Sequence, residues 1–428
     1  MAEGLDTPSR TADAGIARRL ATAALDRVPA GRAARVFLLV AFVDACGRGL
    51  FLAGSALFFT DVLGLTTAQI GTGLSLAGLT GLACAVPIGR LADRFGDWRT
   101  LVALQLWRAA GFVVYPLASG FPAFLAIACY IGAVEQAVGP VIQSVAGSVA
   151  EGESQVRTMA LVAVVRNVAY ALSALAATVV IAGASPSFYV AFVLGNAVAF
   201  VVTAVLLVRL RLAGGRRDGD ADVVRAPAAR LPLTDLPFLV LTVANGILYL
   251  HVAILGIAFP LWIVTKTSAP DSLVGIVLVV NTVMAVTLQV RLSAGGDDIR
   301  RAGRKQRQAG LALAGFCAIA AVSDSVGPVP AAALLLAATV AMTLGELWQS
   351  AGAWGISYGL APPSRRAYYL SAYQIGATGL TVLGPAVLTV AVVDTGAVGW
   401  IGLAVVFLVA GTVVPVVVPV AARRAFSP

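Results

Sequence analysis

Long apolar stretches that alternate with short polar ones dominate this sequence. Most of them are long enough to cross a hydrocarbon layer of about 30 Å as a single helix. They lie at residues 36–60, 67–88, 101–118, 121–149, 159–183, 187–208, 237–264, 273–290, 309–323, 330–358, 367–390 and 397–420. The pattern predicts an all-α membrane protein with twelve transmembrane helices.

The composition agrees with that prediction. Of the 428 residues, 59% are hydrophobic and 12% are charged, whereas a soluble domain carries about 25% charged residues. The mean hydropathy is +0.91. Residues 1–34 contain several arginines but no uninterrupted apolar core, which argues against a cleaved signal peptide and favours a retained tail.

The basic residues predict the orientation of the chain. Lys and Arg in short loops stay on the cytoplasmic side of a membrane. With the N-terminus inside, the inner connections hold nearly all of the 30 Lys and Arg residues, and the outer connections hold only Lys266. We therefore expect a multi-pass protein of the plasma membrane with both termini in the cytoplasm. Because basic loops favour the anionic inner leaflet, the net charge of +9 implies no nucleic acid partner.

A polar stretch in the middle divides the predicted helices six and six. The predicted segments are a cytoplasmic tail at 1–34, a six-helix bundle at 35–208, a cytoplasmic loop at 209–236, a second six-helix bundle at 237–420 and a tail at 421–428. Asp44 matches Asn245 at a spacing of 201, and Arg157 matches Arg366 at a spacing of 209. Such offsets suit two parallel repeats, which bind substrate between them.

One connection, Gly89 to Arg99, carries a dense group of charges between the second and third predicted helices. Its glycines permit tight turns and close helix approach, and an acidic side chain there can lie against the positive end of a neighbouring helix. The spacing of its residues resembles the signature loop of major facilitator superfamily transporters. The residues that carry this resemblance are Gly89, Leu91, Ala92, Asp93, Arg94 and Gly96.

The resemblance implies the major facilitator fold, with two pseudo-symmetric six-helix bundles and both termini cytoplasmic. It also implies secondary active transport by alternating access, with this loop in a cytoplasmic gate against helix eleven. The chain departs from the family in one respect, because Asp97 and Trp98 precede Arg99 where basic residues usually follow the second glycine.

Small residues recur every four positions along predicted helix two and form a smooth stripe. They are Gly73, Ala77, Gly81, Ala85 and Gly89. Such stripes let helix backbones approach closely. We expect Gly376 and Gly384 on helix eleven to form the facing surface, either as static packing or as a moving interface.

Seven ionisable residues fall inside the predicted helices, where each charge costs about 2.5–3.5 kcal/mol. They are Asp44, Arg48, Arg108, Glu135, Arg166, His251 and Glu346. The three carboxylates can neutralise the three arginines around a polar central cavity. Burial favours the neutral form of a carboxyl group and a nearby arginine favours its ionised form, so a change of partners could move a proton. The alternative is a permanent network of salt bridges.

Glu135 and Glu346 are the preferred proton carriers, since they lie near the middle of corresponding helices. His251 could relay protons near neutral pH or could be a hydrogen-bonded packing residue. Neutral polar residues could contact the substrate. These candidates are Gln143, Asn167, Asn245, Tyr249, Asn281 and Gln289.

These features favour a monomeric transporter whose partners are a small-molecule substrate, protons and the lipid bilayer. The expected activity is proton-coupled efflux of a small, rather apolar organic compound; an importing proton symporter is the alternative. The Gly-Pro ending that many of the family's antiporters carry on helix five is missing from this chain, which weakens antiport.

A remote alternative is an intramembrane serine protease. Gly73-Leu74-Ser75-Leu76-Ala77 nearly matches G-x-S-x-G, and His251 would be its base. The missing second glycine argues against this enzyme. No cofactor or metal is expected, because the four cysteines lack C-x-x-C spacing and no lysine stands in a G-K-[ST] context.

Overall fold

The computed structural model describes residues 31–150, 154–181, 186–213 and 232–425. Their regular structure is helical, as expected of a backbone that must satisfy its own hydrogen bonds inside a bilayer. The first half contains α2 (Arg32–Leu57) with its π-helical end η1 (Phe58–Val62), α3 (Thr67–Phe95), α4 (Asp97–Val114) with the 3-10 turn η2 (Tyr115–Leu117), α5 (Gly120–Val149), α6 (Gln155–Ile181) and α7 (Pro186–Ala213).

The second half repeats this order of long helices. It contains the 3-10 turn η4 (Pro232–Thr234), α8 (Leu236–Tyr249), α9 (His251–Ala253), the π-helical η5 (Ile254–Ala258), α10 (Phe259–Lys266), α11 (Leu273–Ser293), α12 (Ile299–Val322), α13 (Pro328–Leu360), the 3-10 turn η6 (Pro363–Arg365), α14 (Arg366–Leu388) with its π-helical end η7 (Thr389–Asp394), and α15 (Ala397–Ala425).

Ten helices within the described residues are long and apolar enough to span a membrane. Two further long helices, α12 and α14, begin with turns that carry arginines. With these two, the described residues form twelve long helical segments, called rods below, in the order of the twelve predicted segments. Several rods are longer than predicted, because polar first or last turns extend them beyond their apolar stretches. Thus α12 begins at Ile299 rather than near residue 309.

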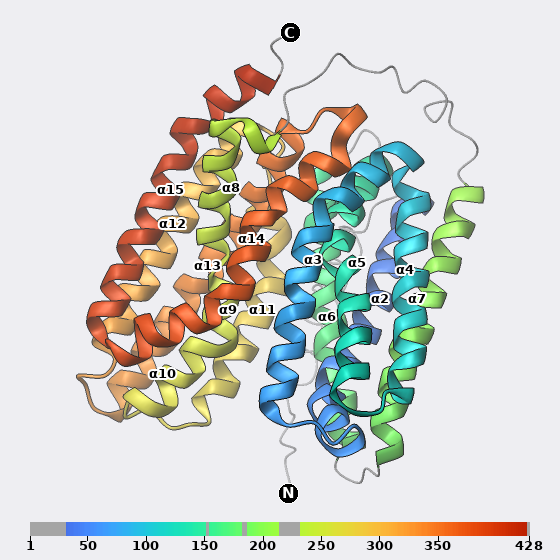
Figure 1. Ribbon diagram of the computed structural model, residues 1–428. Coiled ribbons are helices and arrows are strands. Elements are labelled where there is room, and N and C mark those ends of the chain that lie inside the picture. Colours follow the sequence, from blue (N-terminus) through green and yellow to red (C-terminus); the bar gives the residue numbers. More distant parts are fainter. Residues whose placement is uncertain (1–30, 151–153, 182–185, 214–231, 426–428) are drawn as a thin grey trace, which may run out of the picture.

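Figure 1 shows two bundles side by side, with α2 to α7 in one and α8 to α15 in the other. In the first bundle α3 packs against α5, and α4 packs against α7; in the second, α11 packs against α13, and α12 packs against α15. These are corresponding pairs, so the two halves share one packing pattern. The halves meet where α14 contacts α3 and α5, and where α6 contacts α11 and α13.

The charged connection between the second and third predicted helices is mostly helical. Helix α3 continues through the motif to Phe95, and α4 begins at Asp97. Only Gly96 separates them, with a φ of 92° in the region that favours glycine. Its N–H donates to the carbonyl oxygen of Ala92 at 2.8 Å. The predicted hinge is therefore a one-residue turn between two helices.

The seventh rod is interrupted rather than continuous. Helix α8 ends at Tyr249, and the π-helical η5 follows before α10 begins. Pro260 lies in the first turn of α10. A proline ring clashes with the carbonyl group four residues earlier and leaves it without a donor, and a π turn is one way to accommodate such a break.

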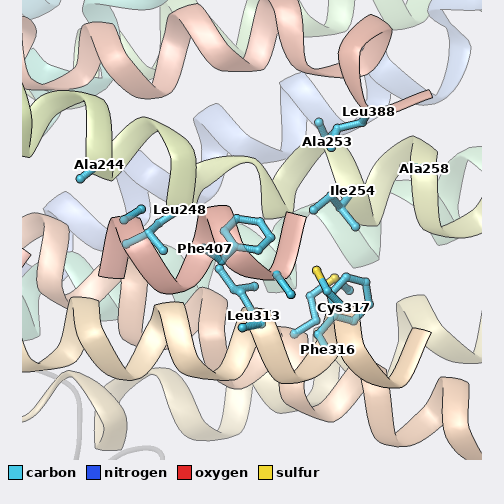
Figure 2. Close-up of a cluster of buried hydrophobic side chains, with 14 of the residues drawn as sticks. Ala244, Leu248, Ala253, Ile254, Ala258, Leu313, Phe316, Cys317, Leu388 and Phe407 are labelled. Carbon is cyan, nitrogen blue, oxygen red and sulfur yellow. The ribbon is translucent and has the colours of Figure 1, made fainter. Parts of the chain in front are cut away.

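Aromatic side chains fill the cores of both halves. In the second half Trp400 contacts Trp262 and Phe316 edge-on, with ring centroids 5.7 Å and 5.3 Å apart. Figure 2 shows part of this core, where Phe316 and the free thiol of Cys317 pack beside Ile254. Cys317 is fully buried and is a packing residue, as its apolar context predicts.

The stripe of small residues on α3 packs mainly against α5 of the same half. A Cβ atom added to Gly73 would lie 2.3 Å from the ring of Phe124, and one added to Gly81 would lie 2.5 Å from the carbonyl oxygen of Gly132. Among the glycines of the stripe, Gly89 meets α14 closely: a Cβ atom there would lie 2.5 Å from Oγ of Ser371 and 2.9 Å from the carbonyl oxygen of Ala367.

The prediction that Gly376 and Gly384 face this stripe is wrong. A Cβ atom added to Gly376 would lie 2.0 Å from the carbonyl oxygen of Thr242, and one added to Gly384 would lie 3.0 Å from Leu250. Both neighbours belong to the seventh rod. Because glycine has no side chain, these two positions let α14 pack closely against the seventh rod of its own half.

Gly310 and Gly315 on α12 provide a test of this packing. A Cβ atom on Gly310 would lie 2.6 Å from the carbonyl oxygen of Phe407 on α15, whereas one on Gly315 would meet nothing within 4 Å. We expect Gly310→Leu to lower the free energy of unfolding by about 1–3 kcal/mol through overpacking. Gly315→Leu should change it by less than about 0.5 kcal/mol. Thermal unfolding in detergent measures both, and equal losses would contradict this account.

Candidate functional site

One end of the molecule, which carries the α3–α4 and α11–α12 turns and their arginines, is closed by contacts between the halves. We call it the basic end. Both carboxylate oxygens of Asp93 accept backbone N–H groups at the start of α14, from Ala367 at 2.9 Å and from Tyr368 at 3.0 Å. The first N–H groups of a helix lack intrahelical partners and carry partial positive charge. Asp93 therefore caps a helix of the opposite half, which corresponds to predicted helix eleven.

The other charged residues of the motif have different surroundings. Arg90 lies over the ring of Tyr368, 4.7 Å from its centroid, and donates to the hydroxyl oxygen at 3.1 Å. Arg94 lies 5.4 Å from the ring centroid of Phe95. Leu91 and Arg99 are exposed. Thus Arg90 reinforces the contact with α14, whereas Arg99 is exposed at the start of α4.

In a second capping contact, a carboxylate of the second half caps a helix of the first half. Asp297, in the turn before α12, accepts the N–H of Val156 at 3.1 Å and the hydroxyl of Ser154, at the start of α6. The sequence analysis missed Asp297. It lies 204 residues after Asp93, which falls between the repeat spacings of 201 and 209, so the internal similarity contained a signal for it.

Gln143, predicted as a substrate contact, instead joins the halves at the basic end. Its Nε2 donates to Oγ of Ser357 at 2.8 Å, and its backbone carbonyl accepts the hydroxyl of Tyr358. With the two capping carboxylates, these bonds close the basic end between α3, α5 and α6 on one side and α11, α13 and α14 on the other.

Deeper in the first half, buried charges converge on Arg108 of α4. Its guanidinium lies 3.1 Å from Asp44 and 3.0 Å from Glu135, and it stacks 3.7 Å from the ring centroid of Phe200. Gln105 donates to Asp44 at 3.0 Å and accepts from Arg108 at 2.7 Å. Arg108 is thus fully enclosed by groups that compensate its charge.

Glu135 connects this buried group to a more accessible one. Its second oxygen pairs with Arg48, so one carboxylate bridges two guanidinium groups. The side chains of Arg48 and Glu135 are 25% and 30% exposed, whereas that of Arg108 is 1% exposed. The Glu135 carboxylate is therefore partly exposed, whereas Arg108 is enclosed.

Arg166 and Glu346 depart from the predicted pairing of three arginines with three carboxylates. Arg166 donates to the hydroxyl of Tyr170 at 3.2 Å, and no carboxylate of the described residues lies within the 4.0 Å of a salt bridge. Glu346 accepts from Nδ2 of Asn281 at 2.8 Å. Tyr249 lies within electrostatic range of both charges. Arg166 lies on α6 of the first half, and Glu346 lies on α13 of the second half.

The remaining predicted polar residues lie in the second half or beside Arg166. His251 is buried and its Nδ1 is 2.9 Å from the carbonyl oxygen of Leu248, while Asn245 accepts from Gln349 at 2.9 Å. Gln289 is buried, and its Nε2 has no hydrogen-bond partner among the described residues. Asn167 is partly exposed.

Comparison with known proteins supports the family resemblance. The family model described as Major Facilitator Superfamily matches residues 37–244, which include the motif and the charge network. Over these residues the chain is similar to the major facilitator superfamily, as its signature loop predicts. It is a transporter and not an enzyme; Ser75 is exposed on α3 in the first half, whereas His251 is buried in the second.

Solved transporters share the fold over nearly the whole chain. A crystal structure of a bacterial homologue of the iron transporter ferroportin in an outward-facing state matches with a TM-score of 0.71 at 14% identity, over 92% of this chain and 100% of that one. The human organic anion transporter MFSD10 (TETRAN) matches with a TM-score of 0.59 at 14% identity, over 90% and 100%. No curated protein matches this chain in sequence.

The capping role of Asp93 can be tested by opening the basic end. Asp93→Asn removes the negative charge, and a charged acceptor contributes about 1.5–3 kcal/mol per hydrogen bond. We expect a reactive cysteine at the fully buried Ser371, in a background without the native cysteines, to react at least tenfold faster with a soluble maleimide. The exposed Asp271 supplies the control Asp271→Asn. Unchanged labelling of Ser371→Cys in the Asp93→Asn protein would exclude a closing role for this carboxylate.

Proposed function

We propose that this transporter exports a small, rather apolar organic compound in exchange for protons. The closed basic end would face the cytoplasm, so the structure would represent an outward-facing or occluded step of alternating access. The concentration of basic residues at that end supports this orientation in the plasma membrane. We expect the transporter to work as a monomer, with its substrate bound between the halves.

One observation carries the proposal of proton coupling: Glu135 bridges Arg48 and Arg108 while its side chain stays 30% exposed. Isolated charges within a membrane are costly, so a carboxylate that loses an arginine during a conformational change is favoured to take up a proton. Glu346 is the second candidate, because its bond to Asn281 leaves it without an arginine partner among the described residues.

The fold alone leaves the charge of the substrate open. The two solved transporters described above are named for cargo of different kinds, iron in one case and organic anions in the other. An apolar organic substrate is supported instead by this chain's own residues. Its many Leu, Val, Phe and Trp positions supply apolar surface, and it offers few of the polar groups that a sugar would need.

Replacing the two carboxylates tests the coupling. We expect Glu135→Gln and Glu346→Gln to reduce accumulation of substrates from a panel of small organic compounds at least tenfold in inside-out vesicles under an imposed pH gradient. Substrate exchange without a gradient should persist, because the amides preserve shape. Asp324→Asn, at an exposed carboxylate, should behave as the wild type. Normal uphill transport by both Gln variants would refute this assignment.

An importing proton symporter is a second candidate, favoured by the position of Arg166. An anionic substrate bound to this arginine would add a negative charge, and protonation of Glu346 would compensate it. A substrate and a proton that bind together move in the same direction. Under an inward proton gradient, symport would accumulate organic anions in right-side-out vesicles and be abolished by an uncoupler, whereas exchange would deplete the substrate from them.

A further inference from the structure

A groove lies on the outer side of the first half, away from the charge network and from the interface between the halves. It runs between α4 and α7 at the basic end, and its volume is about 310 Å³. Trp98, Arg99 and Arg211 line one part of it, and aliphatic side chains line the rest. We propose that this groove binds one anionic phospholipid, with the phosphate on the two arginines and an acyl chain along the aliphatic wall.

The two arginines come from adjacent helix ends. Arg99 lies in the first turn of α4 and is exposed, and Arg211 lies in the last turn of α7 and is half-buried. Helices α4 and α7 pack against each other, so both arginine side chains line the same groove. A guanidinium presents a planar set of donors that matches the oxygens of a phosphate group. The paired positive charges attract an anionic headgroup.

The aliphatic wall continues from the arginines toward the middle of the bundle. Leu106 follows Arg99 by seven residues, which places it about 10 Å further along the helix. Leu106 and Val208 are exposed in the structure, and a bilayer would cover them with hydrocarbon. Trp98, half-buried at the polar end of the groove, is a residue type enriched at membrane–water interfaces.

The groove therefore has the polarity of a phospholipid, with charge at the membrane surface and apolar surface toward the membrane core. Inorganic phosphate would use the arginines and leave the aliphatic wall empty. A lipid from the leaflet at the basic end satisfies both parts, and on the proposed orientation this is the anionic cytoplasmic leaflet. This site is separate from the substrate pathway and does not depend on the proposed direction of transport.

The site also accounts for the departure of this chain from the signature loop. Asp97 turns inward and accepts the hydroxyl of Ser144 on α5. Trp98 and Arg99 follow it and line the groove. A bound lipid would thus attach the start of α4 to α7, directly after the Gly96 turn that ends the motif.

Lipid binding to the full-length purified protein tests the proposal without any transport assay. Titration with fluorescent phosphatidylglycerol and phosphatidylcholine of the same acyl chains, with native mass spectrometry to count bound lipids, gives the affinities. We expect the Arg99→Gln/Arg211→Gln double variant to bind phosphatidylglycerol about 30-fold more weakly than the wild type. The control Arg300→Gln/Arg304→Gln removes two exposed arginines from α12 and should change the affinity less than threefold.

A second variant tests the aliphatic wall. Ala103 lines the groove and is exposed, so Ala103→Trp fills the groove while both arginines remain. We expect it to weaken phosphatidylglycerol binding at least fivefold, whereas millimolar glycerol 3-phosphate should fail to displace the lipid. The proposal is overturned if the wild type binds both lipids equally, if the two double variants lose equal affinity, or if glycerol 3-phosphate displaces the lipid.

Discussion

Each helix begins with backbone N–H groups that have no partner within the helix and carry partial positive charge. At the basic end of this protein, two such helix starts lie at the interface between the halves. Asp93 of the first half caps α14, and Asp297 of the second half caps α6. Because each acceptor comes from the opposite half, separation at this end would break both sets of capping hydrogen bonds. The closed arrangement therefore depends on contacts that exist only between the halves.

The buried charged residues differ between the two halves, although the halves share one helix-packing pattern. Arg48 and Tyr249 occupy positions 201 residues apart. In the first half Arg48 pairs with Glu135, whereas in the second half Tyr249 lies near Glu346, which is held by an amide. Neutral hydrogen bonds thus replace an ion-pair network. Such an asymmetry gives the second half one carboxylate with no arginine partner among the described residues, and this supports its proposed role in taking up protons.

Much of the fold was predictable because long apolar segments have one stable form in a bilayer. The order of the helices, the division into halves and the family resemblance all followed from the chain itself. Boundaries were less predictable, since polar turns extend α12 beyond its apolar stretch and Pro260 interrupts the seventh rod. The partners of individual side chains were least predictable. Gly376 packs within its own half, and Gln143 binds across the interface. The sequence around these two positions contains no pattern that separates contacts within a half from contacts between the halves.

The sequence by itself determined that this protein is a helical membrane transporter, and it identified the buried charges and the motif. Hydropathy, charge bias and motif spacing are properties of local segments and can be found without coordinates. Only the tertiary structure decided that Asp297 caps α6 as Asp93 caps α14, that Glu135 bridges two arginines, and that Arg99 and Arg211 share a groove. These contacts depend on how helices distant in sequence pack against one another. The energy of a hydrogen bond or ion pair depends on the distance between its two groups, and the sequence of one segment does not determine that distance when the groups lie on different helices.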